Sequence, residues 1–394
     1  MGKFSSIIMR HTIRTINALF PKKGNKVMFA SIPDFADNSR ALYEYMISQD
    51  DFCNWSYVWF VKPGFTITEN KNTRYIYAFD TYFSKGYFIY LYHVFTCRYL
   101  FCTHSQFVEA NPRRQISVCL WHGTMLKRIC AMNEREKNQP QKDQYRYFVS
   151  PSHFYDKFFC KSFLCKPEQV LTCGYPRNDL LFQGTDILQM LGIDRKEYNK
   201  IIIYMPTFRT PIGGGYNDSN IDNPSCINLS DTQSVKDLST YLRERGVLFV
   251  IKWHPADTRQ YQDVQMTNVI SVSNKQLSEK NLQIYHLLHY ADALITDYSS
   301  VYCDYMILDR PIAFDISDIN SYADNRGFVF DKPLDYMPGY FLKTSEDILK
   351  FIDDIVQDKD QSYEKRHDLA KIYNEFEGGL ASERLMKSIM LKLK

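Results

Sequence analysis

Four short polar segments carry the side chains that could do chemistry, and each of them follows an apolar run. They contain His122 and His254, whose imidazoles can accept or donate a proton near pH 7. Hydroxyl and cationic side chains accompany both histidines, and these groups bind phosphate well. The segments therefore point to chemistry on a phosphate; they are Trp121–Thr124, Pro206–Arg209, Lys252–Pro255 and Thr296–Ser300.

The Thr296–Ser300 segment joins a short apolar strand to a segment with a helical apolar pattern, Val301–Leu308. A strand that enters a helix through small hydroxyl residues leaves free N–H groups and a positive dipole end, which suit a phosphate. Ser299 or Ser300 could instead simply cap the helix, and the two roles are not exclusive. Asp297 and Asp304 could be metal ligands, ribose acceptors or structural hydrogen-bond partners, and the structural reading is favoured for Asp304.

His122 leaves the predicted strand Ile116–Leu120, and Gly123 permits close backbone approach there. Thr124 is predicted to cap a helix that carries Lys127. The pattern fits a general base beside an anion site. A lone histidine at a strand end is more often structural, so the motif alone is weak evidence for a base.

Two further segments supply positive charge and a hydroxyl. His254 is followed by Pro255 and preceded by Lys252, and groups of this kind stabilise charge on a phosphate or a leaving group. Arg209 offers a fork for bidentate phosphate binding beside the hydroxyl of Thr207. The alternative for Arg209 is a surface salt bridge.

Strands alternate with helical stretches along the whole chain, which predicts an α/β fold with mostly parallel sheets. The boundary between two such series is expected near residues 180–200. The four polar segments fall at the carboxyl ends of predicted strands, where open parallel sheets bind ligands. The predicted strands are Lys26–Ile32, Tyr57–Val61, Tyr75–Ala78, Tyr99–Cys102, Ile116–Leu120, Tyr147–Val149, Val170–Cys173, Ile201–Met205, Val247–Lys252, Val269–Val272, Ala293–Ile295 and Pro311–Phe314.

Composition excludes several classes of protein. The net charge of the 394 residues is only +3, so charge gives no reason to expect a nucleic-acid partner. The ten cysteines have no metal-finger spacing and are expected to be reduced, buried thiols. No apolar run approaches the roughly 18 residues of a membrane span, and no signal peptide is recognisable. A cytoplasmic location is therefore expected.

Two segments of the first half have a helical pattern, and each could either pack on the domain or bind a membrane or a ligand. Residues 1–33 contain no acidic residue and form a basic amphipathic pattern, which could lie on an anionic membrane surface or pack on the domain. The aromatic-rich segment Tyr82–Phe95 is interpreted as a buried helix rather than as a ligand platform.

An ordered series of motifs resembles the CDP-glycerol:poly(glycerophosphate) glycerophosphotransferases, which build teichoic acids and related capsular polymers. The resemblance covers most of the chain, and several motifs in the same order make it specific. The motifs are DFADNSRALYEYM (34–46), WHGTMLKRI (121–129), GYPRND (174–179), YMPTFR (204–209), KWHP (252–255), ITDYSSVYCDY (295–305), RPIAF (310–314) and YADNRGFVFD (322–331).

The resemblance implies an α/β fold of the GT-B type, with two Rossmann-like domains facing across a cleft. We expect an acceptor-side domain at 26–185 and a donor-binding domain with terminal helices at 186–394. His122 would be the base and His254 the second catalytic residue. The implied donor-binding residues are Thr207, Arg209, Lys252, Thr296, Asp297, Ser299 and Ser300, and the implied acceptor or phosphate-side residues are Gly123, Thr124 and Lys127.

The implied reaction transfers glycerol phosphate from CDP-glycerol to a hydroxyl of a lipid-linked glycan or a polyol-phosphate chain, with release of CMP. The enzyme would work on the inner face of the cell membrane. No metal site is predicted, and the sequence does not dictate a divalent ion. Alternatives are a CDP-ribitol ribitolphosphotransferase, a nucleotide-sugar glycosyltransferase of the same fold, and a non-catalytic scaffold.

Two departures from the family pattern concern the acceptor. Met125 stands where many relatives have proline, and Tyr340 follows Pro338-Gly339 where relatives often have Pro-Gly-Pro. Neither removes a proposed catalytic group, but both could signal a different acceptor. The length of the chain is similar to that of the priming enzymes that add the first glycerol phosphate.

Overall fold

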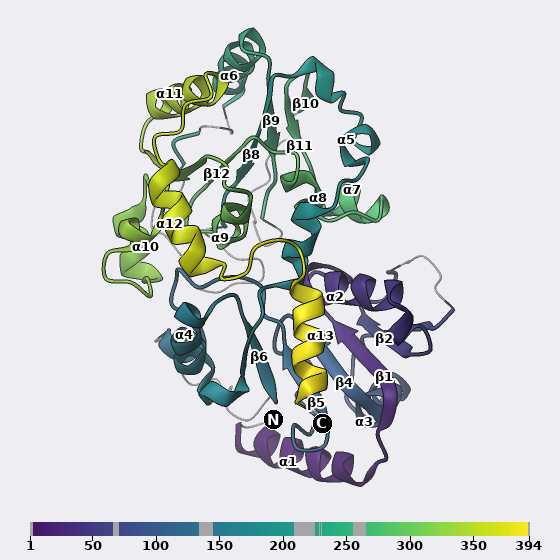
Figure 1. The fold of residues 1–394 in the computed structure, drawn as a ribbon. Helices are drawn as coiled ribbons and strands as arrows, with labels where there is room; N and C mark the ends of the chain where they lie inside the picture. Colours follow the sequence, from purple (N-terminus) through teal and green to yellow (C-terminus); the bar gives the residue numbers. More distant parts are fainter. Residues whose placement is uncertain are drawn as a thin grey trace. The chain divides into compact units, whose positions relative to one another are not determined.

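The computed structural model divides the chain into two compact units (Figure 1). The first unit comprises Met1–His122, Lys137–Asp179 and Gly379–Lys394, and the second comprises Gly123–Glu136 and Leu180–Gly378. The structure describes residues 3–65, 71–133, 145–208, 225–227, 229, 231–254 and 265–392.

The first unit is built on a seven-stranded sheet in the order β3-β2-β1-β4-β5-β6-β7, and every pairing in it is parallel. Strand order reverses between β1 and β4, which is the switch point where doubly wound sheets bind ligands. The strands are β1 (Lys23–Ala30), β2 (Ser56–Val61), β3 (Thr73–Tyr77), β4 (Cys97–Cys102), β5 (Ile116–Cys119), β6 (Tyr147–Ser150) and β7 (Val170–Thr172).

Helices from both ends of the chain cover the first sheet. The last helix, α13, returns to pack against α2 (Figure 1). Its first turn is held by Asp179, whose carboxyl oxygens accept the backbone N–H groups of Ala381 at 2.7 Å and Ser382 at 3.0 Å. The helices of this unit are α1 (Lys3–Leu19), α2 (Asp37–Ser48), α3 (Lys85–Thr96), α4 (His153–Phe163) and α13 (Ala381–Leu391).

The second unit is built on a seven-stranded sheet in the order β10-β11-β9-β8-β12-β13-β14. All pairings are parallel except that of β10 with β11, and the switch point lies between β8 and β12. The strands are β8 (Lys200–Met205), β9 (Val247–Ile251), β10 (Gln265–Met266), β11 (Val269–Ser271), β12 (Ala293–Thr296), β13 (Ile312–Asp315) and β14 (Tyr340–Leu342).

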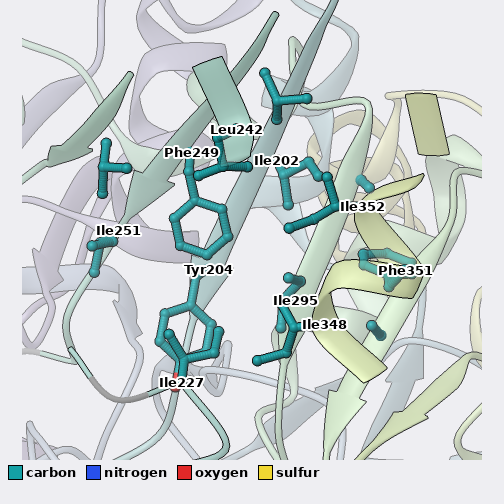
Figure 2. Close-up of a cluster of buried hydrophobic side chains, with 14 of the residues drawn as sticks. Ile202, Tyr204, Ile227, Leu242, Phe249, Ile251, Ile295, Ile348, Phe351 and Ile352 are labelled. Carbon is teal, nitrogen blue, oxygen red and sulfur yellow. The ribbon is translucent and has the colours of Figure 1, made fainter. Parts of the chain in front are cut away.

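Eight helices of the described chain belong to the second unit, and two of them, α6 and α11, cover one face of its sheet. Their buried side chains meet those of the central strands in the cluster drawn in Figure 2, where Leu242 of α6 and Phe351 of α11 pack with Phe249 and Ile295. The helices are α5 (Ile187–Met190), α6 (Thr232–Glu244), α7 (Asn274–Glu279), α8 (Ile284–Leu288), α9 (Val301–Tyr305), α10 (Ile319–Asn325), α11 (Ser345–Val356) and α12 (Tyr363–Tyr373).

All twelve predicted strands are present, with ends that differ by a few residues. Their sequences are continuous apolar runs, as expected of parallel strands covered on both faces; all five residues of β9 are buried. The short strands β10 and β14 were not predicted. No helix in the described part of the chain has both the length and the apolar character needed to cross a membrane.

Two predictions about burial need correction. The predicted helix at Tyr82–Phe95 exists as α3, but its outer face is exposed, including Phe88 and Tyr92. Its inner face, with Tyr87 and Tyr90, is buried as expected. All ten cysteines are free thiols, and Cys53 is exposed rather than buried.

Candidate active site

The segments predicted to bind the donor lie side by side at one edge of the second sheet. β9, β8 and β12 are neighbours in the sheet and run parallel, so the segments that follow them emerge together. Lys252 and His254 follow β9, Thr207 follows β8, and Asp297–Ser300 follow β12. The structure therefore brings together the described donor-side residues at the switch point of the sheet.

Asp297 ties the ends of β8 and β12 to each other. Its Oδ2 accepts the backbone N–H of Thr207 at 2.9 Å and the hydroxyl of Thr207 at 2.8 Å. The hydroxyl of Thr296 donates to the carbonyl of Met205 at 2.6 Å. Asp297, Thr207 and Thr296 are all buried, so these contacts fix the backbone from which Ser299 and Ser300 project.

Lys252 places an amine inside the protein beside the same edge. Its side chain is only 5% exposed, and burial lowers its pKa to about 8. Its Nζ donates to the carbonyl of Trp253 at 3.1 Å. A buried amine in this environment gains strongly from an anionic ligand, because the anion compensates the cost of burying the charge.

His254 and the serine turn are more open. The His254 side chain is partly exposed, and its ring centroid lies 4.7 Å from that of Phe208. Ser299 and Ser300 are partly exposed; Ser300 occupies the N-cap position of α9, but its side chain makes no capping hydrogen bond. Arg209 lies outside the described residues.

Asp304 has a different environment from Asp297. It is fully buried in α9, and its Oδ2 accepts the hydroxyl of Tyr285 at 2.6 Å. This contact joins α9 to α8, as expected of a carboxyl that holds the fold.

In the first unit, His122 projects from a constrained backbone after β5. Trp121 has a φ of 57° and Gly123 a φ of 149°, both in the region that side chains with a Cβ rarely adopt. The Nδ1 of His122 lies 3.1 Å from the carbonyl oxygen of Thr103. Since a carbonyl only accepts, Nδ1 carries the hydrogen in this bond, and Nε2 of the neutral ring holds the basic lone pair.

Three sequence motifs converge on the backbone around His122. The side chain of Asn38 donates to the carbonyl of Trp121 at 2.8 Å and accepts the N–H of Arg177 at 3.0 Å. Arg177 donates to the carbonyl of His122 at 3.0 Å and forms an ion pair with Asp37 at 2.9 Å. These contacts hold the strained turn and set the direction of the imidazole.

The predicted helix after Thr124 is wrong, because the segment is irregular up to a short 3-10 turn at Cys130–Met132. Lys127 forms an antiparallel bridge with Phe328, and the N–H of Val329 donates to the carbonyl of Leu126 at 2.9 Å. This pairing satisfies backbone groups that a helix would otherwise satisfy. Thr124 is buried, and its hydroxyl has no hydrogen-bond partner within the part of the chain that the structure describes.

A sequence comparison identifies the family of this chain. The pattern of the CDP-Glycerol:Poly(glycerophosphate) glycerophosphotransferases matches residues 12–391. The chain belongs to this family.

Two curated members of the glycerophosphotransferase family are similar over nearly their whole length. The teichoic acid poly(glycerol phosphate) polymerase of Bacillus spizizenii is 26% identical, with 98% of each chain covered. The teichoic acid ribitol-phosphate primase of the same organism is 25% identical, with 94% of this chain and 92% of the relative covered. At about 25% identity, the relatives thus include one protein named for glycerol phosphate and one named for ribitol phosphate.

A solved structure supports the fold of this glycerophosphotransferase. The wall teichoic acid polymerase TagF superposes with a TM-score of 0.74 at 22% identity, over 99% of this chain and 97% of that chain. The predicted fold class, two parallel-sheet α/β domains of the GT-B type, is confirmed.

Sequence reasoning missed several residues that contact His122 or the backbone beside it. Asn38 and Arg177 lie in motifs that the sequence singled out without giving these residues a role. Thr103 and His104 had no signal except their place after the predicted strand Tyr99–Cys102. No group of three or more His, Cys, Asp and Glu side chains suited to a metal ion occurs among the residues that the structure describes.

Proposed function

We propose that this enzyme transfers glycerol phosphate from CDP-glycerol to a hydroxyl of a polyol-phosphate chain or a lipid-linked glycan. The observation that carries the proposal is the 3.1 Å contact between Nδ1 of His122 and the carbonyl oxygen of Thr103: a carbonyl accepts, so we infer that Nδ1 carries the hydrogen and that Nε2 is the basic nitrogen of the neutral ring. In a member of a glycerophosphotransferase family, a fixed base of this kind suits deprotonation of an acceptor hydroxyl.

In the proposed step, the acceptor oxygen attacks the phosphorus that bears glycerol. The new oxygen–phosphorus bond forms while the bond from that phosphorus to the bridging oxygen of the diphosphate breaks. CMP leaves with the bonding electron pair, and the hydroxyl proton passes to Nε2 of His122. Positioning and electrostatic stabilisation carry most of the catalysis in such transfers.

The donor diphosphate is proposed to lie against the edge of the second sheet. Lys252 and His254 would offset its charge, with Arg209 as a further cation from the sequence motif. Thr207, Asp297 and Thr296 would hold the backbone in place, while Ser299 and Ser300 would contribute hydroxyls and amides. Gly123, Thr124 and Lys127 are proposed to act on the acceptor or phosphate side, and the buried hydroxyl of Thr124 supports this assignment.

The affinity for CDP-glycerol is expected to fall as pH rises through about 8, because the Lys252 amine loses its proton there. At a pH one unit above this value only about a tenth of the amine is charged, so affinity should fall up to about tenfold. Calorimetry between pH 7 and 9.5 measures the effect. Lys252→Arg keeps its charge and should flatten the profile; an unchanged slope in that variant would assign the pH effect to another group.

A donor panel with CMP release as the readout tests the proposed function. CDP-glycerol and a polyol-phosphate acceptor should give turnover, while nucleotide sugars should give none. Similarity to a ribitol-phosphate primase makes CDP-ribitol the second donor to compare. Faster turnover with CDP-ribitol would replace glycerol by ribitol in the proposal. Turnover with nucleotide sugars alone, or binding without turnover over all acceptors, would reject it.

We also propose that the enzyme works at the cytoplasmic face of the membrane through α1 and α3. The residues that follow α1 contact the end of α3, since the rings of Phe20 and Phe95 lie 5.0 Å apart and Lys22 donates to the carbonyl of Phe95. Exposed apolar side chains on and beside the two helices, together with the basic residues of α1, suit an anionic interface. These side chains are Ile16 and Leu19 of α1, Phe20 directly after it, Tyr82 and Phe83 before α3, and Phe88, Ile89 and Tyr92 of α3.

Substitution of exposed residues is the sharper test of membrane binding. Deleting the whole helix would also remove Asn17, which is buried and donates to the carbonyl of Glu109 at 2.9 Å. The pair Leu19→Ser and Phe88→Ser should instead lower binding to phosphatidylglycerol vesicles on the order of tenfold. Tyr363→Ser, an equally exposed aromatic on α12, is the matched control. Equal sedimentation of both variants with vesicles would reject the proposed surface.

A further inference from the structure

A second histidine lies flat against the proposed base. His104 follows β4, the strand that pairs with β5, and its ring centroid is 4.0 Å from that of His122 with an interplanar angle of 7°. The ring of Trp121 lies 3.9 Å from His122 and 6.5 Å from His104. The His122 imidazole is therefore held between two aromatic rings, and the contact with His104 is a parallel stack.

Thr103 connects the two imidazoles. Its carbonyl accepts Nδ1–H of His122 at 3.1 Å, and its hydroxyl hydrogen-bonds to Nδ1 of His104 at 2.8 Å. One residue at the switch point of the first sheet thus orients both rings.

The backbone of His104 is fixed independently of His122. Its N–H donates to Oε1 of Gln106 at 2.9 Å, and its carbonyl accepts the hydroxyl of Tyr145 at 3.0 Å. The thiol of Cys102 also lies 3.2 Å from that carbonyl. The backbone of His104 is therefore held by contacts that do not involve His122, and the hydroxyl of Thr103 orients its ring.

The electrostatic surroundings keep His104 uncharged at neutral pH. Burial lowers its pKa, and the carboxyl of Asp37 only partly opposes this shift. Asp37 is itself paired with Arg177. The neighbouring Tyr145 stays protonated because burial raises its pKa well above the usual value. When His122 takes a proton, it thus faces a neutral ring and not a second cation.

We propose that His104 is a positioning residue for His122: its ring face fixes the orientation of the base and stabilises the imidazolium formed during transfer. A neutral aromatic face attracts a cation stacked on it, and an aligned base acts faster than a rotating one. The inference rests on the proposed function, since it assigns His104 a role through His122. The proposed role depends on the flat ring of His104. It does not involve proton transfer to or from that ring.

The test compares three substitutions of His104 in the full-length enzyme. His104→Ala should lower kcat for CMP release by about 10-fold to 100-fold with donor affinity unchanged. His104→Leu, which keeps bulk but not planarity, should resemble alanine. His104→Phe should keep kcat within about threefold of the original, because phenylalanine retains a flat aromatic face. Nitrogen-15 NMR should detect a single Nδ1–H tautomer of His122 in the original and in His104→Phe, and mixed tautomers in His104→Ala.

Several outcomes would overturn the inference. If His104→Ala is folded and turns over at the original rate, the stacked ring has no role in catalysis. If His104→Phe is as slow as His104→Ala, the imidazole nitrogens and not the ring face are required. Loss of stability without a change in the His122 tautomer would mean a purely structural role.

The His122→Ala variant separates this inference from the proposed function. If His122→Ala retains turnover, the assignment of the base fails, and the proposed function fails in that part. If His122→Ala is inactive while His104→Ala equals the original, only the role of His104 is rejected. In the His122→Ala background, the further change His104→Ala is expected to have no effect on the residual rate.

Discussion

Replacing His122 by alanine is expected to lower the rate of CMP release by about 10²-fold to 10⁴-fold, the usual contribution of a general base. The variant removes Nε2, the only ring nitrogen that is not committed to the carbonyl of Thr103. Binding of CDP-glycerol should persist, because the proposed donor residues follow β8, β9 and β12 of the other sheet. The measurements are single-turnover CMP release and calorimetric titration with CDP-glycerol.

The control for His122→Ala is His367→Ala. The His367 side chain is 47% exposed on α12 and lies 3.2 Å from a carboxyl oxygen of Asp309. Its removal should leave turnover unchanged. Should His122→Ala keep the original rate with its fold intact, His122 would be a structural histidine at a strand end.

Local sequence was sufficient to predict most of the fold. Buried parallel strands read as uninterrupted apolar runs, and β9 and β12 are clear cases. The positions of the polar segments then follow from a general property of parallel sheets, that ligands bind beyond the carboxyl ends of strands. The strands that escaped prediction, β10 and β14, have only two and three residues.

The partners of the site residues could not be predicted, because they come from distant parts of the chain. Thr207 and Asp297 are 90 residues apart and meet only through the order of strands in the sheet. Arg177 bonds to the carbonyl of His122 across 55 residues. No local periodicity encodes such contacts, which depend on the assembled sheet.

The irregular segment after His122 illustrates how tertiary contacts override local preference. Thr124 followed by Lys127 and Arg128 reads as a capped helix. In the fold, the N–H of Arg128 instead donates to the carbonyl of Gly327 at 3.1 Å, and its Nε donates to the carbonyl of Phe328 at 3.0 Å. An isolated β-bridge and hydrogen bonds to residues about 200 positions away thus determine the local conformation.

Asp297→Ala is expected to destabilise the protein by about 3 kcal/mol and to weaken CDP-glycerol binding by about tenfold or more. The substitution leaves two buried donors of Thr207, the backbone N–H and the hydroxyl, without their acceptor, at a cost of about 1–3 kcal/mol for each group. The segment after β12 would then lose its contact with Thr207, and the position of the serine turn would be less firmly fixed. Urea unfolding and calorimetric titration measure the two effects.

Comparison with Thr207→Val and Asp304→Asn decides whether Asp297 acts through Thr207 or on the donor. If Asp297 only holds Thr207, the losses in Asp297→Ala and Thr207→Val should be strongly non-additive in the double variant. Asp304→Asn weakens a different buried contact, with Tyr285, and should lower stability without changing donor affinity. Full additivity of the two losses in donor affinity would mean that Asp297 contacts the donor itself. Because both donors of Thr207, its backbone N–H and its hydroxyl, bond to the same carboxyl oxygen of Asp297, a large coupling energy between the two residues is the expected result.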